Sequence, residues 1–196
     1  MKEFAKLLFK YRSYTPIPFV IAMLIFQEAT LASILIGLAI ALAGEAFRFW
    51  GVSCAGSETR TTGRVRGSYL VVCGAFGHLR NPLYLGNILI YVGVGIMSMA
   101  LFPYLQIGAF LFSYFQYRLI IREEEEYLRK TYGKDFDNYK KSVSRFMPSI
   151  KAYNAVDLEQ PELNVKTGLR SERRTFQALS VISLLIIIQY IVTNFA

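Results

Sequence analysis

The chain has 196 residues, of which 54% are hydrophobic and 18% are charged, and its formal net charge at pH 7 is +8. Its apolar share exceeds the roughly 45–50% of an average soluble domain, so the composition favours a membrane protein over a soluble one. A net positive charge spread over a soluble surface would suggest nucleic acid, but here the charge is confined to separate blocks, and we expect no nucleic-acid partner.

All 22 Lys and Arg residues fall into three blocks, Lys2 to Arg12, Arg48 to Arg80 and Arg118 to Arg174. Lys and Arg collect on the cytoplasmic side of membrane proteins, so the three blocks belong on one side and each apolar run between them must cross an even number of times. The sequence therefore predicts an all-α, multi-pass bundle of about five transmembrane helices, with its N-terminus and its polar motifs in the cytoplasm.

In chain order, residues 15–51 are predicted to form a first hairpin that turns near Gln27–Thr30. Its first helix, Pro16–Gln27, is short for a full crossing, since a span needs about 20 apolar residues. A cytoplasmic loop with a polar motif follows over residues 52–82. Residues 83–121 form a second hairpin that turns near Leu101–Gln106, where Pro103 interrupts the helix.

The rest of the single membrane domain, residues 1–196, follows the second hairpin. We expect cytoplasmic helices over 122–148, with Gly133 as a stop and a short amphipathic helix on the membrane surface after it. A polar segment with Pro and Gly reads as a linker over 149–175, and residues 176–196 read as the last span.

The first constellation of polar residues is CGAFGHLRNPLYLGN, residues 73–87, where the cytoplasmic loop enters a membrane helix. Pro82 forces Asn81 away from helical geometry. Backbone of this kind persists near a membrane only where protein buries it or where it lines a cavity, so the turn is a candidate wall of a ligand site. The alternative is that Arg80 and Asn81 are interface residues, that Tyr84 anchors an aromatic belt, and that His78 is structural.

The second constellation is RLIIREEEEYL, residues 118–128, with four consecutive carboxylates. Successive helix positions point about 100° apart, so one or two of these glutamates must turn inwards, towards Arg80 or another cation. The alternative is a charged face in water. A further arginine cluster, Arg60 to Arg66, suits headgroup phosphates or an anionic cofactor, or else only fixes the orientation of the chain.

The second hairpin joins the two constellations and brings their cytoplasmic ends side by side. An Asn- and Arg-lined turn beside carboxylates suits a ligand that offers hydroxyls to a Glu and a carboxylate to an Arg. S-adenosylmethionine has these features.

The order and spacing of several blocks resemble the isoprenylcysteine carboxyl methyltransferase family of integral membrane enzymes. The resemblance covers about residues 45–150, and the blocks that carry it are Arg80–Gly86 (RNPLYLG), Glu124–Glu125, Gly133–Tyr139 (GKDFDNY) and Arg145–Pro148 (RFMP). It implies a pocket for S-adenosylmethionine at the cytoplasmic helix ends and a methyl acceptor that enters from the lipid. Asn81 replaces the histidine of the eukaryotic enzymes, as in bacterial relatives, which leaves the acceptor open.

From the residues and the resemblance together we expect transfer of a methyl group from S-adenosylmethionine to a lipid-embedded acceptor, either an isoprenoid or prenylcysteine carboxylate or a lipid amine, with no metal. The expected cofactor-binding residues are Gly74, Phe76, His78, Leu79, Asn81, Pro82, Tyr84, Glu124, Glu125, Arg145 and Pro148. The expected catalytic residues, which address the acceptor, are Arg80, Arg118 and Arg122. Two alternatives remain: an NADPH-dependent sterol or isoprenoid reductase, and a non-catalytic lipid-binding protein.

Overall fold

The computed structural model describes residues 2–56, 70–154 and 158–195, and of residues 2–6 the backbone alone. The described part is all-α, as predicted. The cluster Arg60 to Arg66 lies outside the described residues. The helices are α1 Lys2–Tyr11, α2 Ile17–Ile25, α3 Leu31–Ala55, α4 Ala75–His78, α5 Pro82–Ser98, α6 Tyr104–Tyr132, α7 Lys134–Ser142 and α8 Val165–Phe195.

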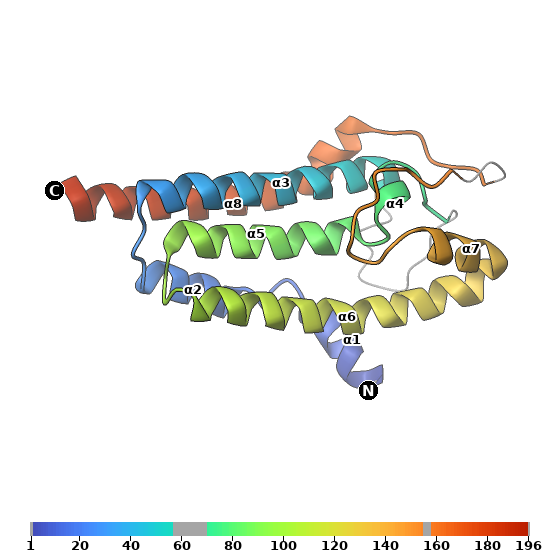
Figure 1. Ribbon diagram of the computed structural model, residues 1–196, viewed down its shortest axis with the longest axis horizontal. Helices are drawn as coiled ribbons and strands as arrows, with labels where there is room; N and C mark the ends of the chain where they lie inside the picture. Colours follow the sequence, from blue (N-terminus) through green and yellow to red (C-terminus); the bar gives the residue numbers. More distant parts are fainter. Residues whose placement is uncertain (1, 57–69, 155–157, 196) are drawn as a thin grey trace.

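The long helices lie side by side in an elongated bundle, with α3 and α8 on one side, α5 in the middle, and α2 with α6 on the other side (Figure 1). Both turns, 26–30 and 99–103, lie at the same end as the C-terminus, close to the predicted positions. Helices α4 and α7 lie at the opposite end, which we call the polar end. The first hairpin differs from a simple one because α2 packs mainly against α5 rather than against its chain neighbour α3.

Glycines allow α3 and α5 to approach closely along their length. A Cβ atom added at Gly37 would lie 2.4 Å from the carbonyl oxygen of Gly93, and one at Gly44 would lie 2.6 Å from that of Gly86. Both contacts are to backbone, which cannot move aside. Small residues at such positions are typical of helix pairs in membranes, where backbone contact replaces burial from water as the source of attraction.

We expect Gly93→Ala to lower the free energy of unfolding by about 1–3 kcal/mol, the usual cost of overpacking. The new Cβ would lie 2.6 Å from the amide nitrogen of Ala41 and 2.6 Å from the oxygen of Gly37. Gly108→Ala is the matched control, because no atom lies within 4 Å of its added Cβ. Thermal unfolding in detergent measures both, and equal midpoints for the two variants would contradict the close α3–α5 packing.

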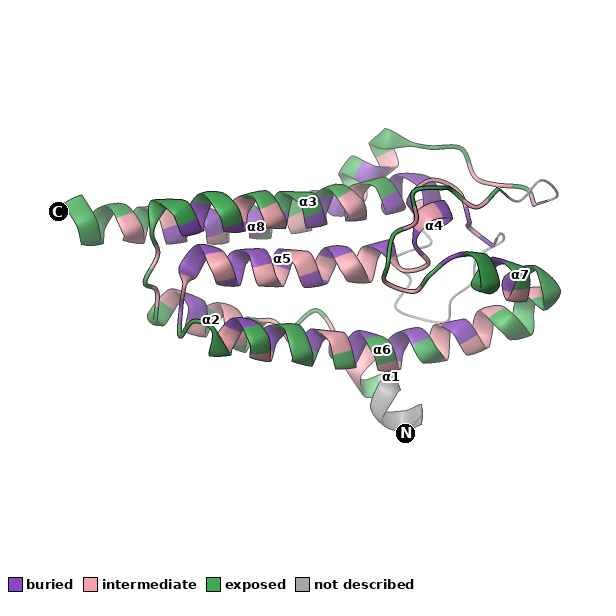
Figure 2. Ribbon diagram, viewed as in Figure 1, coloured by how far each residue is buried: buried purple, intermediate pink, exposed green. Residues whose placement is uncertain are grey.

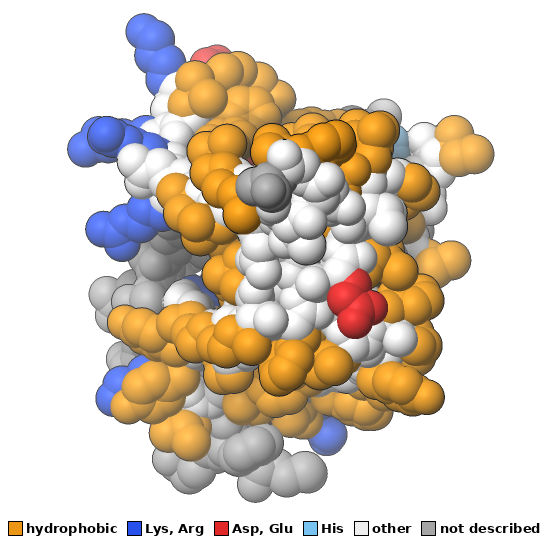
Figure 3. Space-filling view, turned by 90° about the vertical axis from the view of Figure 1, so that its left-hand side faces the viewer, with side chains coloured by type: hydrophobic (Ala, Val, Ile, Leu, Met, Phe, Trp, Pro, Cys, Tyr) orange, Lys and Arg blue, Asp and Glu red, His pale blue; other side chains and the backbone are white. Residues whose placement is uncertain are grey.

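Two helices, α3 and α8, are apolar and long enough to cross a membrane, with mean hydropathies of 1.7 and 2.0, and α5 is apolar but shorter. Large apolar side chains face outwards on α3 and α8, including Leu35 and Leu185, whereas buried residues face the interior of the bundle (Figure 2). The end with the turns is mostly hydrophobic and carries little charge (Figure 3). The nine residues of α2 rise only about 14 Å, so the count of five spans stays a prediction.

Two segments differ from their predicted form. Helix α8 begins at Val165, so the region read as a linker up to residue 175 is partly helical. Asn164 caps this helix by accepting a hydrogen bond from the Thr167 amide at 2.9 Å, and Gly168 lets it lie close to Ser53 of α3. The second segment is α7.

Helix α7 was expected to lie on the membrane surface, but its apolar side packs on protein. Phe136 and Tyr139 are buried together with Leu70, Val72 and Val143 in a small core at the polar end. Leu70 and Val72 therefore cover the apolar side of α7, which the sequence pattern assigns to the membrane surface.

Candidate functional site

A cavity of about 830 Å³ runs through the bundle from the polar end into its apolar part; we call it the main cavity. At the polar end it is lined by Phe76, Arg80, Asn81, Glu124, Tyr132 and Tyr139. Further along it is lined by Phe19, Met23, Ile90, Val94, Phe112 and Leu179. One continuous space thus joins polar side chains to apolar ones.

The Asn-Pro turn has the irregular geometry that the sequence predicts. Asn81 has φ −130° and ψ 60°, and Pro82 begins α5. The Asn81 side-chain amide donates to the carbonyl oxygen of Arg145 at 3.3 Å, and the Arg80 amide donates to the oxygen of Ser144 at 2.9 Å. The turn is therefore held against the segment after α7, and it forms a wall of the main cavity.

The glutamate cluster divides between two faces of α6, because adjacent helix positions point in different directions. Glu124 lines the main cavity and accepts a hydrogen bond from the Tyr84 hydroxyl at 2.7 Å. Glu125, only 8% exposed, pairs with Arg145 at 2.6 Å and with Arg80 at 3.2 Å. The prediction that one or two glutamates turn inwards towards Arg80 is confirmed. Glu126 instead pairs along the helix with Lys130.

The two inward glutamates differ in acidity. Burial raises the pKa of Glu124 to about 7, although the Tyr84 hydrogen bond and the charge of Arg12 oppose the rise. Burial alone would raise the pKa of Glu125 too, but the hydrogen bonds from Arg145 and the charge of Arg80 outweigh it and lower that pKa. Glu125 therefore stays ionised as part of an ion cluster, whereas Glu124 can take up or release a proton near neutral pH.

The outer groove is a second hollow, on the far side of this ion cluster. It is lined by Arg118, Arg122, Glu125, Glu126, Arg129, Lys140 and Arg145. Arg118 and Arg122 thus line the outer groove and not the main cavity. Their contact with the acceptor therefore stays a prediction. Of the three predicted catalytic residues, Arg80 is the one that lines the main cavity.

Five of the predicted cofactor-binding residues lie near the turn without lining either hollow: Gly74, His78, Leu79, Pro82 and Pro148. His78 bonds the Ser149 carbonyl oxygen through Nδ1 at 2.8 Å and packs its ring against Trp50. Gly74 has φ +55°, and its Cβ would lie 2.1 Å from the Cys54 sulfur. These contacts are structural, so the predicted role of these residues in cofactor binding stays a prediction.

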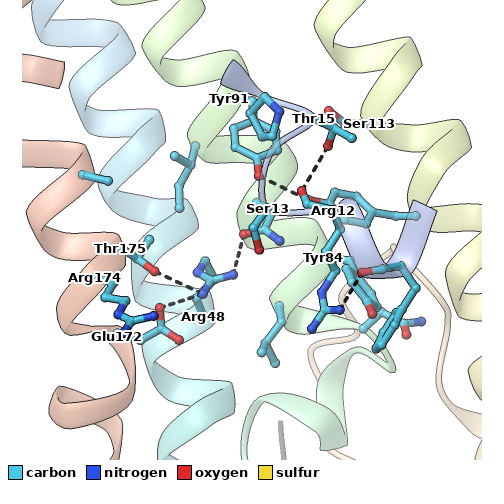
Figure 4. Close-up of a pocket in the computed structure, with 18 of the residues that line it drawn as sticks. Arg12, Ser13, Thr15, Arg48, Tyr84, Tyr91, Ser113, Glu172, Arg174 and Thr175 are labelled. Carbon is cyan, nitrogen blue, oxygen red and sulfur yellow. Dashed lines mark hydrogen bonds and ion pairs between the residues drawn. The ribbon is translucent and has the colours of Figure 1, made fainter. Parts of the chain in front are cut away.

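Sequence reasoning missed a buried ion network on the opposite wall of the main cavity (Figure 4). Arg48 of α3 pairs with Glu172 of α8 at 2.6 Å and with Glu45 at 3.5 Å, and it also bonds Asn87 and Thr175. Glu172 is fully buried. In the sequence, the one local sign of this network is Glu45, a carboxylate within an apolar run that lies three residues before Arg48.

The polar end of the main cavity fits the predicted cofactor. The Nε atom of Arg80 is buried and has no partner among residues 2–56, 70–154 and 158–195, so it can donate to a ligand carboxylate. Phe76, Tyr132 and Tyr139 supply aromatic surface for a nucleobase, and Glu124 can accept from hydroxyl or ammonium groups. Charge and shape at this end are therefore compatible with S-adenosylmethionine.

Comparison with known proteins gives one family, described as phospholipid methyltransferase, which matches residues 32–135. The match runs from the start of α3 to the start of α7, and it includes the Asn-Pro turn and the glutamate pair. No curated protein matches the chain.

Proposed function

Because this chain belongs to the phospholipid methyltransferase family, we propose that it transfers methyl groups to the amine of a membrane phospholipid at the cytoplasmic face. It is a membrane methyltransferase that uses S-adenosylmethionine. Its family belongs to the same superfamily as the isoprenylcysteine carboxyl methyltransferases, which accounts for the resemblance seen in the sequence. Membership also sets aside the reductase and the non-catalytic alternatives.

The observation that carries the proposal is the continuity of the main cavity between its polar and apolar parts. A phospholipid needs both environments at once, since its headgroup must reach the cofactor while its acyl chains stay in an apolar setting. The polar wall supplies Arg80, Asn81 and Glu124, and the apolar wall lies among membrane-facing helices.

Glu124 favours an amine over a carboxylate as acceptor. A carboxylate acceptor has no proton to lose and would be repelled by a second carboxylate in the same cavity. An ammonium group is attracted by Glu124 and must give up a proton before its nitrogen can attack. With a pKa of about 7, Glu124 is matched to this task as a general base.

Bound S-adenosylmethionine supplies a methyl group from a sulfonium, which becomes a neutral thioether as the new bond forms. In this proposal Arg80 and Asn81 hold the cofactor, and Phe76 with Tyr139 encloses its base. Tyr84 orients Glu124 through the 2.7 Å hydrogen bond. Positioning of the two reactants contributes much of the rate acceleration, because in-line transfer needs close alignment and no covalent enzyme intermediate.

The test is incubation of purified protein with methyl-labelled S-adenosylmethionine and vesicles of defined composition. We expect label in phosphatidylethanolamine and none in phosphatidylcholine, whose nitrogen already carries its full set of methyl groups. Label in a prenylated carboxylic acid, with phosphatidylethanolamine unlabelled, would overturn the amine proposal.

A further inference from the structure

A phospholipid amine is separated from its phosphate by a two-carbon linker, so a site that binds the amine at Glu124 also needs a place for a phosphate close by. This inference therefore rests on the proposed function. The described cations that line the main cavity are Arg12, Arg48, Arg80 and Arg174. Their partners decide which of them can bind an anion.

Three of these four cations are poor candidates. Arg48 is already paired with Glu172 and Glu45, and Arg80 is paired with Glu125. A phosphate at Arg48 would lie next to buried carboxylates, and the one donor of Arg80 without a partner among the described residues is assigned above to the carboxylate of the cofactor. Arg174 is exposed on α8, on the opposite side of the cavity from Tyr84 (Figure 4).

Arg12 differs from Arg48 and Arg80 in having no carboxylate partner in the part of the chain that the structure describes. Its guanidinium lies 3.9 Å from the centre of the Phe9 ring and donates through Nη1 to the Phe9 carbonyl oxygen at 2.8 Å. These two contacts fix the guanidinium without neutralising its charge. The remaining N–H donors suit the oxygens of a phosphate, for which guanidinium geometry is favourable.

The position of Arg12 in the main cavity also suits a phosphate site. Its guanidinium lies beside Tyr84 in the main cavity (Figure 4). It is close enough to Glu124 for its charge to oppose the rise of the Glu124 pKa. A bound headgroup could therefore contact both side chains, with its cationic nitrogen towards Glu124.

Hydroxyl groups from two elements also line the main cavity. Ser13 and Thr15 belong to the segment between α1 and α2, and Ser113 belongs to α6. Thr15 donates to the Gln116 side chain at 3.0 Å, which ties the segment to α6. This hydrogen bond holds the segment that follows Arg12 against α6, which limits the movement of Arg12.

We propose that Arg12 binds the phosphodiester of the acceptor lipid and so selects phospholipids over other membrane amines. Arg12 is a specificity residue in this scheme, and it takes no part in the transfer of the methyl group.

The test compares Arg12→Gln with wild type on two acceptors, phosphatidylethanolamine and a long-chain alkylamine that lacks phosphate. We expect KM for phosphatidylethanolamine to rise about tenfold or more, the loss expected for hydrogen bonds to a charged group. At a pH well above 7, where Glu124 is ionised with or without the opposing charge of Arg12, the kcat for that lipid and both constants for the alkylamine should stay near wild type. Arg12→Lys should recover part of the loss, and Lys10→Gln, which removes an exposed charge two residues earlier, in α1, should cause none.

A binding measurement separates this inference from the proposed function. Calorimetric titration with a short-chain phosphatidylethanolamine should show weaker binding to Arg12→Gln, while binding of S-adenosylmethionine stays unchanged and reports an intact fold. Binding that depends on Arg12 in a protein that does not methylate the lipid would overturn the amine proposal and leave the phosphate site standing. Unchanged KM and Kd in Arg12→Gln would overturn the phosphate site, whatever the activity.

Discussion

Replacing Glu124 by Gln is expected to lower kcat for methyl transfer to a phospholipid amine by about 10²–10⁴-fold, the usual contribution of a general base. The substitution keeps the size of the side chain and an acceptor for the Tyr84 hydroxyl, but the amide cannot take up a proton. Rates with labelled S-adenosylmethionine and phosphatidylethanolamine vesicles measure the effect. Binding of the cofactor should change much less than kcat.

The same residue predicts the pH dependence of the wild-type enzyme. Glu124 must be ionised to accept a proton, and burial raises its pKa to about 7. Activity should therefore reach a plateau above pH 7 and fall about tenfold per pH unit below it. Stability should change in the opposite sense: the folded protein holds a proton on Glu124 more tightly than the unfolded chain, so the contribution of this group falls as pH rises from about 4.5 to about 7.

Glu123→Gln is the matched control, because this neighbour in the same cluster lines neither the main cavity nor the outer groove. It removes one negative charge from the same helical turn and should leave kcat and the pH profile close to wild type. If Glu124→Gln kept the wild-type profile, or if Glu123→Gln lost as much activity, Glu124 would not be the base.

Arg48→Met is expected to cause the largest loss of stability, about 3–5 kcal/mol, because it removes a buried cation that pairs with two buried carboxylates. Glu172 is fully buried and Glu45 is 2% exposed, and both pair with Arg48. Glu172→Gln should cost less, since Arg48 keeps Glu45 as a partner. The double variant Arg48→Met with Glu172→Gln should regain part of the loss, because one of the two buried carboxylates that lost Arg48 is then neutral.

Arg129→Met supplies the comparison for this buried network. Arg129 pairs with Asp137 at 3.1 Å, but its side chain is 66% exposed, and exposed pairs of this kind contribute about 0–1 kcal/mol. Unfolding of the four variants in detergent at a fixed pH gives the ranking. A loss in Arg48→Met no larger than that in Arg129→Met would show that the α3–α8 ion pair does not hold the helices together.

The sequence predicted those features that depend on local chemistry. The Asn81 turn follows from the proline after it, and the position of the second turn follows from Pro103 and the limits of the apolar runs. The inward glutamates follow from helix geometry, because four neighbouring side chains cannot share one face. Each of these inferences needs only residues close together in the chain.

The features that sequence reasoning missed depend on distant partners. Arg48 was counted with a basic block, because its partner Glu172 lies 124 positions away and nothing local marks the pair as buried. The early start of α8 was missed for a similar reason, since Gly168 reads as a breaker until Ser53 of α3 is seen to lie against it. Arg12 was read as part of a basic N-terminal block, and only the fold brings it beside Tyr84.

The shortness of α5 has a consequence for the depth of the Asn-Pro turn. Its 17 residues rise about 26 Å, whereas the hydrocarbon layer of a typical membrane is about 30 Å thick. The longer helices α3, α6 and α8 pack around α5, and none of its residues is exposed, so protein and not lipid covers the difference in length. The turn at the start of α5 would then lie below the level of the lipid headgroups, and an acceptor would reach it without leaving its own leaflet.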